Sequence, residues 1–274
     1  MKYDSGIMGV EIGLDGATPD THDFLRNSQG SFEAAVKGIK SCVNLGFEDV
    51  TIATTLYKGN IEELPEIIDL AEELGATKFY LNRIIAAGRG KNISHLDVSS
   101  DQMIKALDHL CDRFKRATSG EGILCCARGM TYFARTCYER SGGAIFPVSE
   151  VLTGYEGIFK DFGSEVSKIV QKLAKGFGGC SAGLTYCGLS AQGELLPCVI
   201  APINLGNLLE KDLEEIWVEN EVLNYIRDRR KLKGACGRCY YNGICGGCRY
   251  TAYEMLGDWL SPDPSCPYGA KPLP

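Results

Sequence analysis

The sequence predicts an α/β protein in which a parallel sheet is followed by a cysteine-rich domain of short strands and helices. Short β-rich segments alternate with amphipathic helices over residues 9–82, and the turns that join them are short. This alternation is typical of parallel sheets with right-handed crossovers. After residue 179 the pattern changes to short strands, turns and eight of the thirteen cysteines. We therefore predict two domains, at residues 1–178 and 179–274.

The first elements are each bounded by residues that start or stop such elements. Residues 9–14 predict a short buried strand, and residues 18–23 (TPDTHD) predict a capped turn. Residues 31–45 have the apolar spacing of a helix that follows an N-cap serine and is closed by a glycine. Residues 49–57 (DVTIATTLY) are rich in β-branched side chains and predict a second strand.

The following segments repeat the alternation. Residues 61–74 predict an amphipathic helix stopped by a glycine, and residues 77–82 (TKFYLN) predict a third strand. Residues 98–117 predict a helix that is N-capped by a serine at position 99 or 100. Residues 122–128 (GILCCAR) predict a further strand, and residues 165–175 (EVSKIVQKLAK) predict a further helix.

Composition and charge exclude several classes of protein. The net charge is −6 and the pI is about 5.3, so no basic surface for nucleic acid is expected. No segment approaches the roughly 20 apolar residues that a membrane span requires, and the first residues lack the pattern of a signal peptide. We therefore expect a cytoplasmic protein, whose cysteines stay reduced and serve metal or catalytic sites.

Eight cysteines form one ordered run in the last third of the chain. Two pairs have C-x2-C spacing, which places two sulfurs on one tight turn so that both reach the same metal centre. Thiolates suit both zinc and iron–sulfur clusters, so the run is consistent with either. Only five residues separate the two pairs, against about 15–20 in zinc ribbons, and this favours iron–sulfur clusters. The run consists of Cys180, Cys187, Cys198, Cys236, Cys239, Cys245, Cys248 and Cys266.

The cysteine run and the residues around it resemble the SPASM domain, the auxiliary-cluster domain of radical S-adenosylmethionine (SAM) enzymes. The matching features are Cys180-x12-Gly193-x4-Cys198, Leu205-Gly206-Asn207, Glu215-Ile216-Trp217, the two C-x2-C pairs followed by Arg249, Gly257-Asp258, and Asp263-Pro-x-Cys266.

The first half of the chain is similar to part of the (β/α)6 barrel of the same family. Residues 10–16 with Arg26 resemble its fourth strand and the helix that follows. Thr51–Asn60 resembles the fifth strand and Phe79–Arg89 the sixth. The resemblance therefore implies the C-terminal half of a partial radical SAM barrel, followed by a SPASM domain.

This resemblance implies two auxiliary [4Fe–4S] clusters whose complete thiolate ligation suits electron transfer. In many family members, three residues separate the two cysteines of the second pair. Here only two residues separate Cys245 and Cys248, so the division of the eight cysteines between the two clusters stays open. By resemblance, the first set would be Cys180, Cys187, Cys198 and Cys248, and the second would be Cys236, Cys239, Cys245 and Cys266.

One motif of the family does not occur in this sequence. The C-x3-C-x2-C motif that holds the SAM-cleaving cluster is absent, and we expect the chain to be the C-terminal part of a longer enzyme.

Asp15, Arg26 and Asn60 are the candidate SAM-binding residues by resemblance, and no catalytic residue is assigned. Each has a structural alternative: Asp15 as a turn former, Arg26 as an ion-pair partner and Asn60 as a helix N-cap. Gly13 stands where the family usually has a serine that contacts the SAM ribose.

The resemblance implies an enzyme that modifies a substrate by radical chemistry, with the auxiliary clusters transferring electrons. The C-terminal sequence is most similar to that of family members that modify tetrapyrroles in heme biosynthesis. A peptide maturase is the alternative within the family. A low-potential donor such as ferredoxin or flavodoxin is the expected electron partner, with no nucleic acid and no membrane. Outside catalysis, the alternatives are an iron–sulfur electron-transfer or partner-docking module, and a domain stabilised by structural zinc.

Overall fold

The computed structural model describes residues 7, 9–85, 88–127, 131–140, 180, 182–184, 187–242 and 245–269. The chain divides into two compact units, Met1–Gly129 and Met130–Pro274, each with its own buried core. The boundary predicted between residues 178 and 179 and the helix predicted over 165–175 lie outside the described residues. Both stay predictions.

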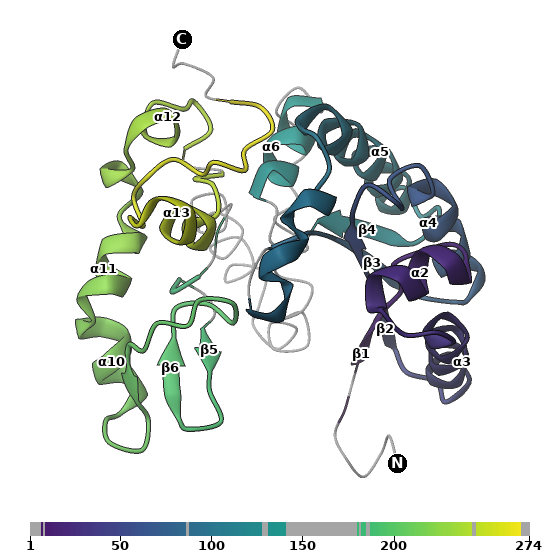
Figure 1. The fold of residues 1–274 in the computed structure, drawn as a ribbon, viewed down its shortest axis with the longest axis horizontal. Coiled ribbons are helices and arrows are strands. Elements are labelled where there is room, and N and C mark those ends of the chain that lie inside the picture. The colour runs from purple at the N-terminus through teal and green to yellow at the C-terminus, as the bar shows by residue number, and fades with distance from the viewer. Residues whose placement is uncertain are drawn as a thin grey trace. The chain divides into compact units, whose positions relative to one another are not determined.

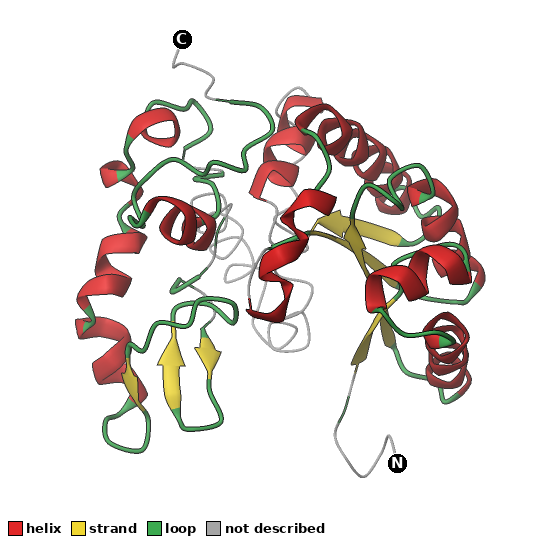
Figure 2. Ribbon diagram, in the orientation of Figure 1, coloured by secondary structure: helices red, strands yellow, loops and turns green. Residues whose placement is uncertain are grey.

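The first unit is built on a parallel sheet with strand order β1-β2-β3-β4. The register pairs Val10 with Val50, Ile52 with Phe79, and Phe79 with Cys125. This sheet confirms the predicted α/β class. The strands are β1 (Gly9–Gly13), β2 (Asp49–Leu56), β3 (Lys78–Arg83) and β4 (Leu124–Ala127), drawn as yellow arrows in Figure 2.

Three helices connect these strands and lie along one side of the sheet (Figure 1): α3 (Ser31–Asn44), α4 (Leu64–Glu73) and α5 (Ser100–Thr118). Each turns an apolar stripe inward, with Ile39, Ile67 and Leu107 fully buried. Of the two serines predicted to cap the last helix, Ser99 is the N-cap. It forms a capping box with Gln102, whose backbone N–H donates to Ser99 Oγ at 3.3 Å.

Some predicted helix starts in this unit are wrong. The serine predicted as the N-cap of the helix over 31–45 is the first helical residue of α3, and Gly30 is the N-cap. Residues 18–23, predicted as a capped turn, form the start of an eight-residue helix, α2 (Pro19–Arg26). Pro19 is the first helical residue, and its ring fixes the φ angle near the helical value. Proline has no backbone N–H, but an N–H at this position would have no partner within the helix, so no hydrogen bond is lost. A short 3₁₀ segment, η1 (Gly88–Leu96), follows β3.

The second unit contains short elements around the cysteine run. A three-stranded antiparallel sheet with order β5-β6-β7 packs with short helices over a core that includes Leu195, Ile216, Leu223 and Trp259. Among the described residues of this unit, the elements are α6 (Thr131–Arg140), β5 (Gly188–Leu189), β6 (Glu194–Leu196), β7 (Gly206–Asn207), α10 (Leu213–Glu219), α11 (Glu221–Arg227), η2 (Arg229–Lys231), α12 (Gly234–Gly237) and α13 (Arg249–Leu256).

None of the helices in the described part of the chain combines the length and the apolar character that a membrane crossing requires.

Candidate metal centre

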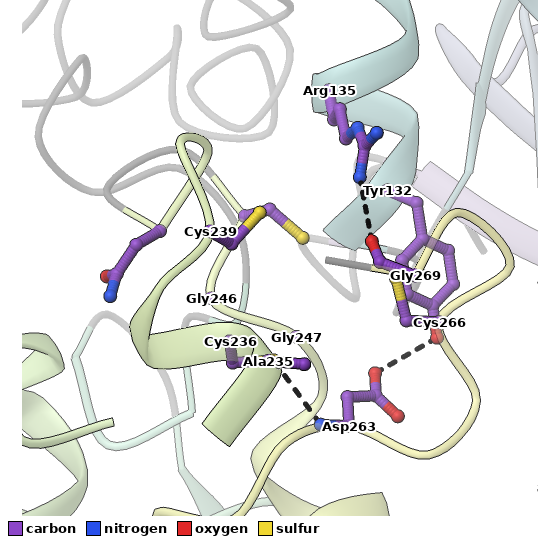
Figure 3. Close-up of a pocket in the computed structure, with 12 residues that line it drawn as sticks. Tyr132, Arg135, Ala235, Cys236, Cys239, Gly246, Gly247, Asp263, Cys266 and Gly269 are labelled. Atoms are coloured by element: carbon purple, nitrogen blue, oxygen red, sulfur yellow. Dashed lines mark hydrogen bonds between the residues drawn. The ribbon is translucent and has the colours of Figure 1, made fainter. Parts of the chain in front are cut away.

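Four thiols of the cysteine run line one cavity in the second unit. Cys236, Cys239, Cys245 and Cys266 are among the residues that line a space of about 100 Å³. Figure 3 labels three of them, Cys236, Cys239 and Cys266. These are the four residues that the resemblance assigned to the second cluster. A volume bounded by four thiols suits a cluster, because a cluster is a body with several iron atoms and its ligands need not converge on one point.

A single-ion site is not formed in the same region. Within the described residues, no group of three or more cysteine, histidine, aspartate or glutamate side chains is placed to hold one metal ion. All thirteen cysteines are described, and none of them forms a disulfide.

Tight backbone turns bring these cysteines to the cavity. Cys236 lies in the one-turn helix α12, and the backbone N–H of Cys239 donates to the Cys236 carbonyl at 3.3 Å. After the second turn, Gly246 and Gly247 have φ angles of +67° and +69°, in the left-handed region that favours glycine. This backbone path turns the chain between Cys245 and Cys248, which explains why the pair contains two consecutive glycines.

A helix that precedes the cysteine run in sequence also lines the cavity. On α6, the Tyr132 hydroxyl donates to Asp263 Oδ2 at 3.0 Å and lies 2.6 Å from Ser265 Oγ. Arg135, one helical turn later, is 3% exposed and donates to the Gly269 carbonyl at 3.4 Å, as Figure 3 shows. Helix α6 therefore belongs to the same unit as the thiols.

The Arg135 guanidinium is held by aromatic rings and a carboxylate. Its central carbon lies 4.8 Å from the Tyr241 ring centre and 4.3 Å from the Tyr268 ring centre, and its Nε lies 3.2 Å from Glu139 Oε1. Burial, together with a hydrogen bond to Glu139, raises the pKa of Tyr241 to about 12, so this phenol is neutral at physiological pH. The site thus keeps a buried cation beside the thiols.

The other four cysteines of the run are not among the residues that line this cavity. Cys180 and Cys248 are close enough to interact electrostatically, and Cys198 and Cys248 both act on Tyr250. Cys187 lies next to strand β5. The described residues around Cys180 and Cys187 are interrupted at 181 and 185–186, so the backbone between these two cysteines is only partly described.

Burial disfavours a bare thiolate at three of the predicted ligands. It raises the pKa of the Cys187, Cys248 and Cys266 thiols, and for Cys248 the nearby Cys180 adds to this effect. Metal ligation requires the thiolate. A metal centre bound at these sulfurs would favour their thiolate form.

The three candidate SAM residues come together in the first unit, at the carboxyl ends of β1 and β2. Asp15 and Asn60 are fully buried, whereas the Arg26 side chain is 45% exposed. Asp15 Oδ1 accepts the Thr55 backbone N–H at 2.7 Å. Asp15 Oδ2 forms an ion pair with Arg26 Nε at a distance of 2.5 Å, but the contact does not have the geometry of a hydrogen bond.

Asn60 has a different structural role from the predicted helix cap. Helix α4 begins at Leu64 with Glu63 as its N-cap residue. Asn60 instead accepts the Tyr57 N–H at 2.8 Å and donates from Nδ2 to the carbonyls of Asp15 (2.8 Å) and Thr55 (2.9 Å). It therefore joins the ends of β1 and β2.

Gly13 explains how Arg26 reaches Asp15. A side chain at position 13 would begin 2.0 Å from Arg26 Nη2, so the guanidinium occupies the space next to the strand. His22 is buried beside it and accepts the Asp15 backbone N–H on Nδ1 at 2.9 Å. Burial lowers the pKa of His22, which keeps this ring neutral and able to accept.

Comparison with known proteins places this arrangement in a family. Residues 180–240 match the SPASM family, described as an iron-sulfur cluster-binding domain. An "AdoMet-dependent heme synthase" of Methanosarcina barkeri is 30% identical over 264 residues, which are 96% of this chain and 68% of that protein. The chain belongs to the radical SAM/SPASM family.

Other members of the radical SAM/SPASM family are more distant. A "Pre-heme d1 synthase" of Dinoroseobacter shibae is 28% identical, over 94% of this chain and 60% of its own length. The crystal structure of Streptococcus suis SuiB bound to precursor peptide SuiA has the same fold, with a TM-score of 0.64 at 16% identity over 94% of this chain and 53% of SuiB. The chain thus spans between about half and two thirds of the length of these proteins.

Some residues at the thiol cavity had no role assigned from sequence. Tyr132 and Arg135 are three positions apart on one face of a helix, but nothing in that spacing points to a cavity more than 100 residues further along the chain. Asp263 and Arg249 are part of the motifs that resemble the SPASM domain, but only the structure shows which groups their side chains contact.

Proposed function

We propose that this chain is the part of a radical SAM/SPASM enzyme that binds two auxiliary [4Fe–4S] clusters for electron transfer. The observation that carries the proposal is the cavity shared by Cys236, Cys239, Cys245 and Cys266. When bound, such clusters supply one-electron chemistry at a potential that the surrounding protein sets. The chain's own residues would hold the thiols in place through the turns that carry them.

The second proposed set consists of the cavity cysteines, and the first consists of Cys180, Cys187, Cys198 and Cys248. The cavity supports the division for the second set, because its four thiols come from two turns and the segment after Asp263. The first set is proposed from the resemblance of the cysteine run to the SPASM domain.

We further propose that SAM binds at the carboxyl ends of β1 and β2, where Asp15, Arg26 and Asn60 meet. Ligands of open parallel sheets bind at this edge. Arg26 is the exposed member, so its guanidinium is the group that would contact the cofactor. Asp15 and Asn60 would act by holding the strand ends and Arg26 in place.

The proposed substrate is a tetrapyrrole, and the proposed electron donor is a low-potential protein such as ferredoxin or flavodoxin. The tetrapyrrole assignment is supported by similarity over nearly the whole chain to proteins named as heme and pre-heme d1 synthases. A peptide substrate is the second candidate, supported by similarity to proteins named mycofactocin maturase.

The proposed ligand sets predict the effect of Cys239→Ala. Protein purified without oxygen should contain about eight iron atoms with equal sulfide, the content of two clusters. Cys239→Ala removes one thiolate of the cavity and should lose about half of the iron, together with part of the absorption near 400 nm. Iron, sulfide and zinc analysis measures this directly.

Cys42→Ala is the matched control, because Cys42 is a free thiol on α3 in the first unit and should leave the iron content unchanged. Full iron retention in Cys239→Ala would contradict the assignment of this residue. About two zinc ions without sulfide in the wild-type protein would instead support a structural zinc domain.

A further inference from the structure

Asp263 connects the two proposed ligand sets through its backbone and its side chain. The Cys248 backbone N–H donates to Asp263 Oδ2 at 2.7 Å, and the Asp263 backbone N–H donates to Cys236 Sγ at 3.4 Å. Cys248 belongs to the first proposed set and Cys236 to the second. One buried carboxylate residue therefore fixes a ligand of each set relative to the other.

Arg249 makes a second connection between the same two cysteines. It follows Cys248 directly in sequence, and its Nη2 lies 3.8 Å from Cys236 Sγ, within the range of a hydrogen bond to sulfur. Its Nη1 donates to the carbonyls of Trp259 and Ser261, both at 2.8 Å, and its Nε donates to the Gly247 carbonyl at 3.4 Å. The guanidinium is thus fully oriented, with one edge toward the sulfur.

The burial of Arg249 needs a compensating charge. The residue is 4% exposed, and its hydrogen-bond acceptors are three carbonyl oxygens and a thiol sulfur. Burying a cation without an anionic partner is costly. The buried carboxylate nearby, Asp263, accepts from Tyr132, Ser265 and Cys248. The Cys236 sulfur lies on the remaining edge of the guanidinium, so an anionic centre bound at this sulfur would be next to the buried charge.

The backbone is adapted to this approach at Gly247. A Cβ atom at this position would lie 2.8 Å from Arg249 Nη2, 3.2 Å from Cys236 Sγ and 2.6 Å from Asp263 Cβ. Any side chain there would separate the guanidinium from the sulfur. The glycine therefore leaves room for the Arg249–Cys236 contact as well as supplying the left-handed turn.

We propose that Arg249 is a positioning residue for Cys236 and that its charge raises the reduction potential of the second cluster. This inference rests on the proposed function. A reduced cluster carries one more negative charge than an oxidised one, so a fixed cation beside a ligand sulfur stabilises the reduced form more. Arginine is suited to this role because its charge does not titrate in proteins.

Two substitutions separate the charge of Arg249 from its packing. Arg249→Lys keeps a positive charge, whereas Arg249→Gln keeps hydrogen-bonding groups and removes the charge. Arg230→Gln is the matched control, because the Arg230 side chain is 91% exposed and pairs with Asp228 on the surface of the same unit. Each protein is loaded with iron and sulfide and titrated potentiometrically, with the cluster states followed by electron paramagnetic resonance.

The expected result is a shift of one of two redox transitions to lower potential in Arg249→Gln, a smaller shift in Arg249→Lys and no shift in Arg230→Gln. Equal potentials in iron-loaded wild type and Arg249→Gln would overturn the inference while leaving the proposed function intact. Equal shifts in the lysine and glutamine variants would also overturn the charge role.

Iron loss provides a second readout if a variant does not hold its cluster. Retention of the second cluster in Arg249→Lys but not in Arg249→Gln would support the charge role. Loss from both, with equal destabilisation of the two iron-free proteins against urea, would assign Arg249 a packing role and overturn the inference. A wild-type protein that binds no iron and sulfide would overturn the proposed function itself.

Discussion

At the scale of single residues, buried polar side chains hold the strand ends of the first unit. Asn60 joins the carbonyls of Asp15 and Thr55, and Asp15 in turn accepts the Thr55 N–H. These bonds close the gap between β1 and β2 at the edge where we propose that SAM binds. Because both side chains are fully buried, each lost bond would leave a polar group without a partner.

We expect Asn60→Ala to reduce the free energy of unfolding by about 2–4 kcal/mol, since it leaves the Tyr57 N–H and two carbonyls unpaired. Urea unfolding followed by circular dichroism measures this. Asn92→Ala, at an exposed position of η1, is the control and should change stability by less than about 0.5 kcal/mol. An equal effect of the two substitutions would contradict the role of Asn60.

At the scale of secondary structure, α6 is the element whose place the sequence did not reveal. It precedes the SPASM match by about 40 residues, yet its Tyr132, Arg135 and Thr136 side chains bond to the segment between Asp263 and Gly269. It therefore covers one side of the thiol cavity and holds the loop that carries Cys266.

Tyr132→Phe tests this role of α6 with a minimal change in volume. The loss of the hydroxyl leaves Asp263 and Ser265 each without one partner and should cost about 1–2 kcal/mol. Iron should also pass to a chelator faster than from the wild-type protein. Tyr240→Phe, at a 47% exposed ring, is the control. Unchanged iron release in Tyr132→Phe would show that α6 does not protect the cavity.

At the scale of the whole molecule, the two compact units have separate cores and separate proposed ligands. The chain's two tryptophans, Trp217 and Trp259, are both in the second unit. Tryptophan fluorescence therefore reports on the cysteine-rich unit alone, while amide hydrogen exchange in β2 and β3 reports on the parallel sheet. Metal ligated by native thiols stabilises only the unit that contains those thiols.

Removal of iron should accordingly shift the urea transition seen by tryptophan fluorescence to lower concentration. Hydrogen exchange of β2 peptides should change little under the same conditions. The comparison uses the whole chain before and after treatment with a chelator without oxygen. Equal loss of protection in both units would show that they unfold as one cooperative body.

Local sequence patterns determined the class of the fold and most of its elements. The alternation of strands and helices placed β1 to β4 and α3 to α5 within a few residues of their bounds, because side-chain periodicity and end signals such as Gly46 act over neighbouring positions. The spacing of the cysteines pointed to two metal-binding turns. The helix at Pro19 was missed, since a short segment with turn residues is compatible with either structure.

The tertiary structure alone decided which distant groups meet. The contact of Tyr132 with Asp263 spans 131 residues, and that of Asn60 with Asp15 spans 45. The four thiols of the cavity come together only after α12, the Gly246–Gly247 turn and α6 are in place. No local pattern encodes such contacts, because they follow from how complete elements pack and from where buried polar groups find partners.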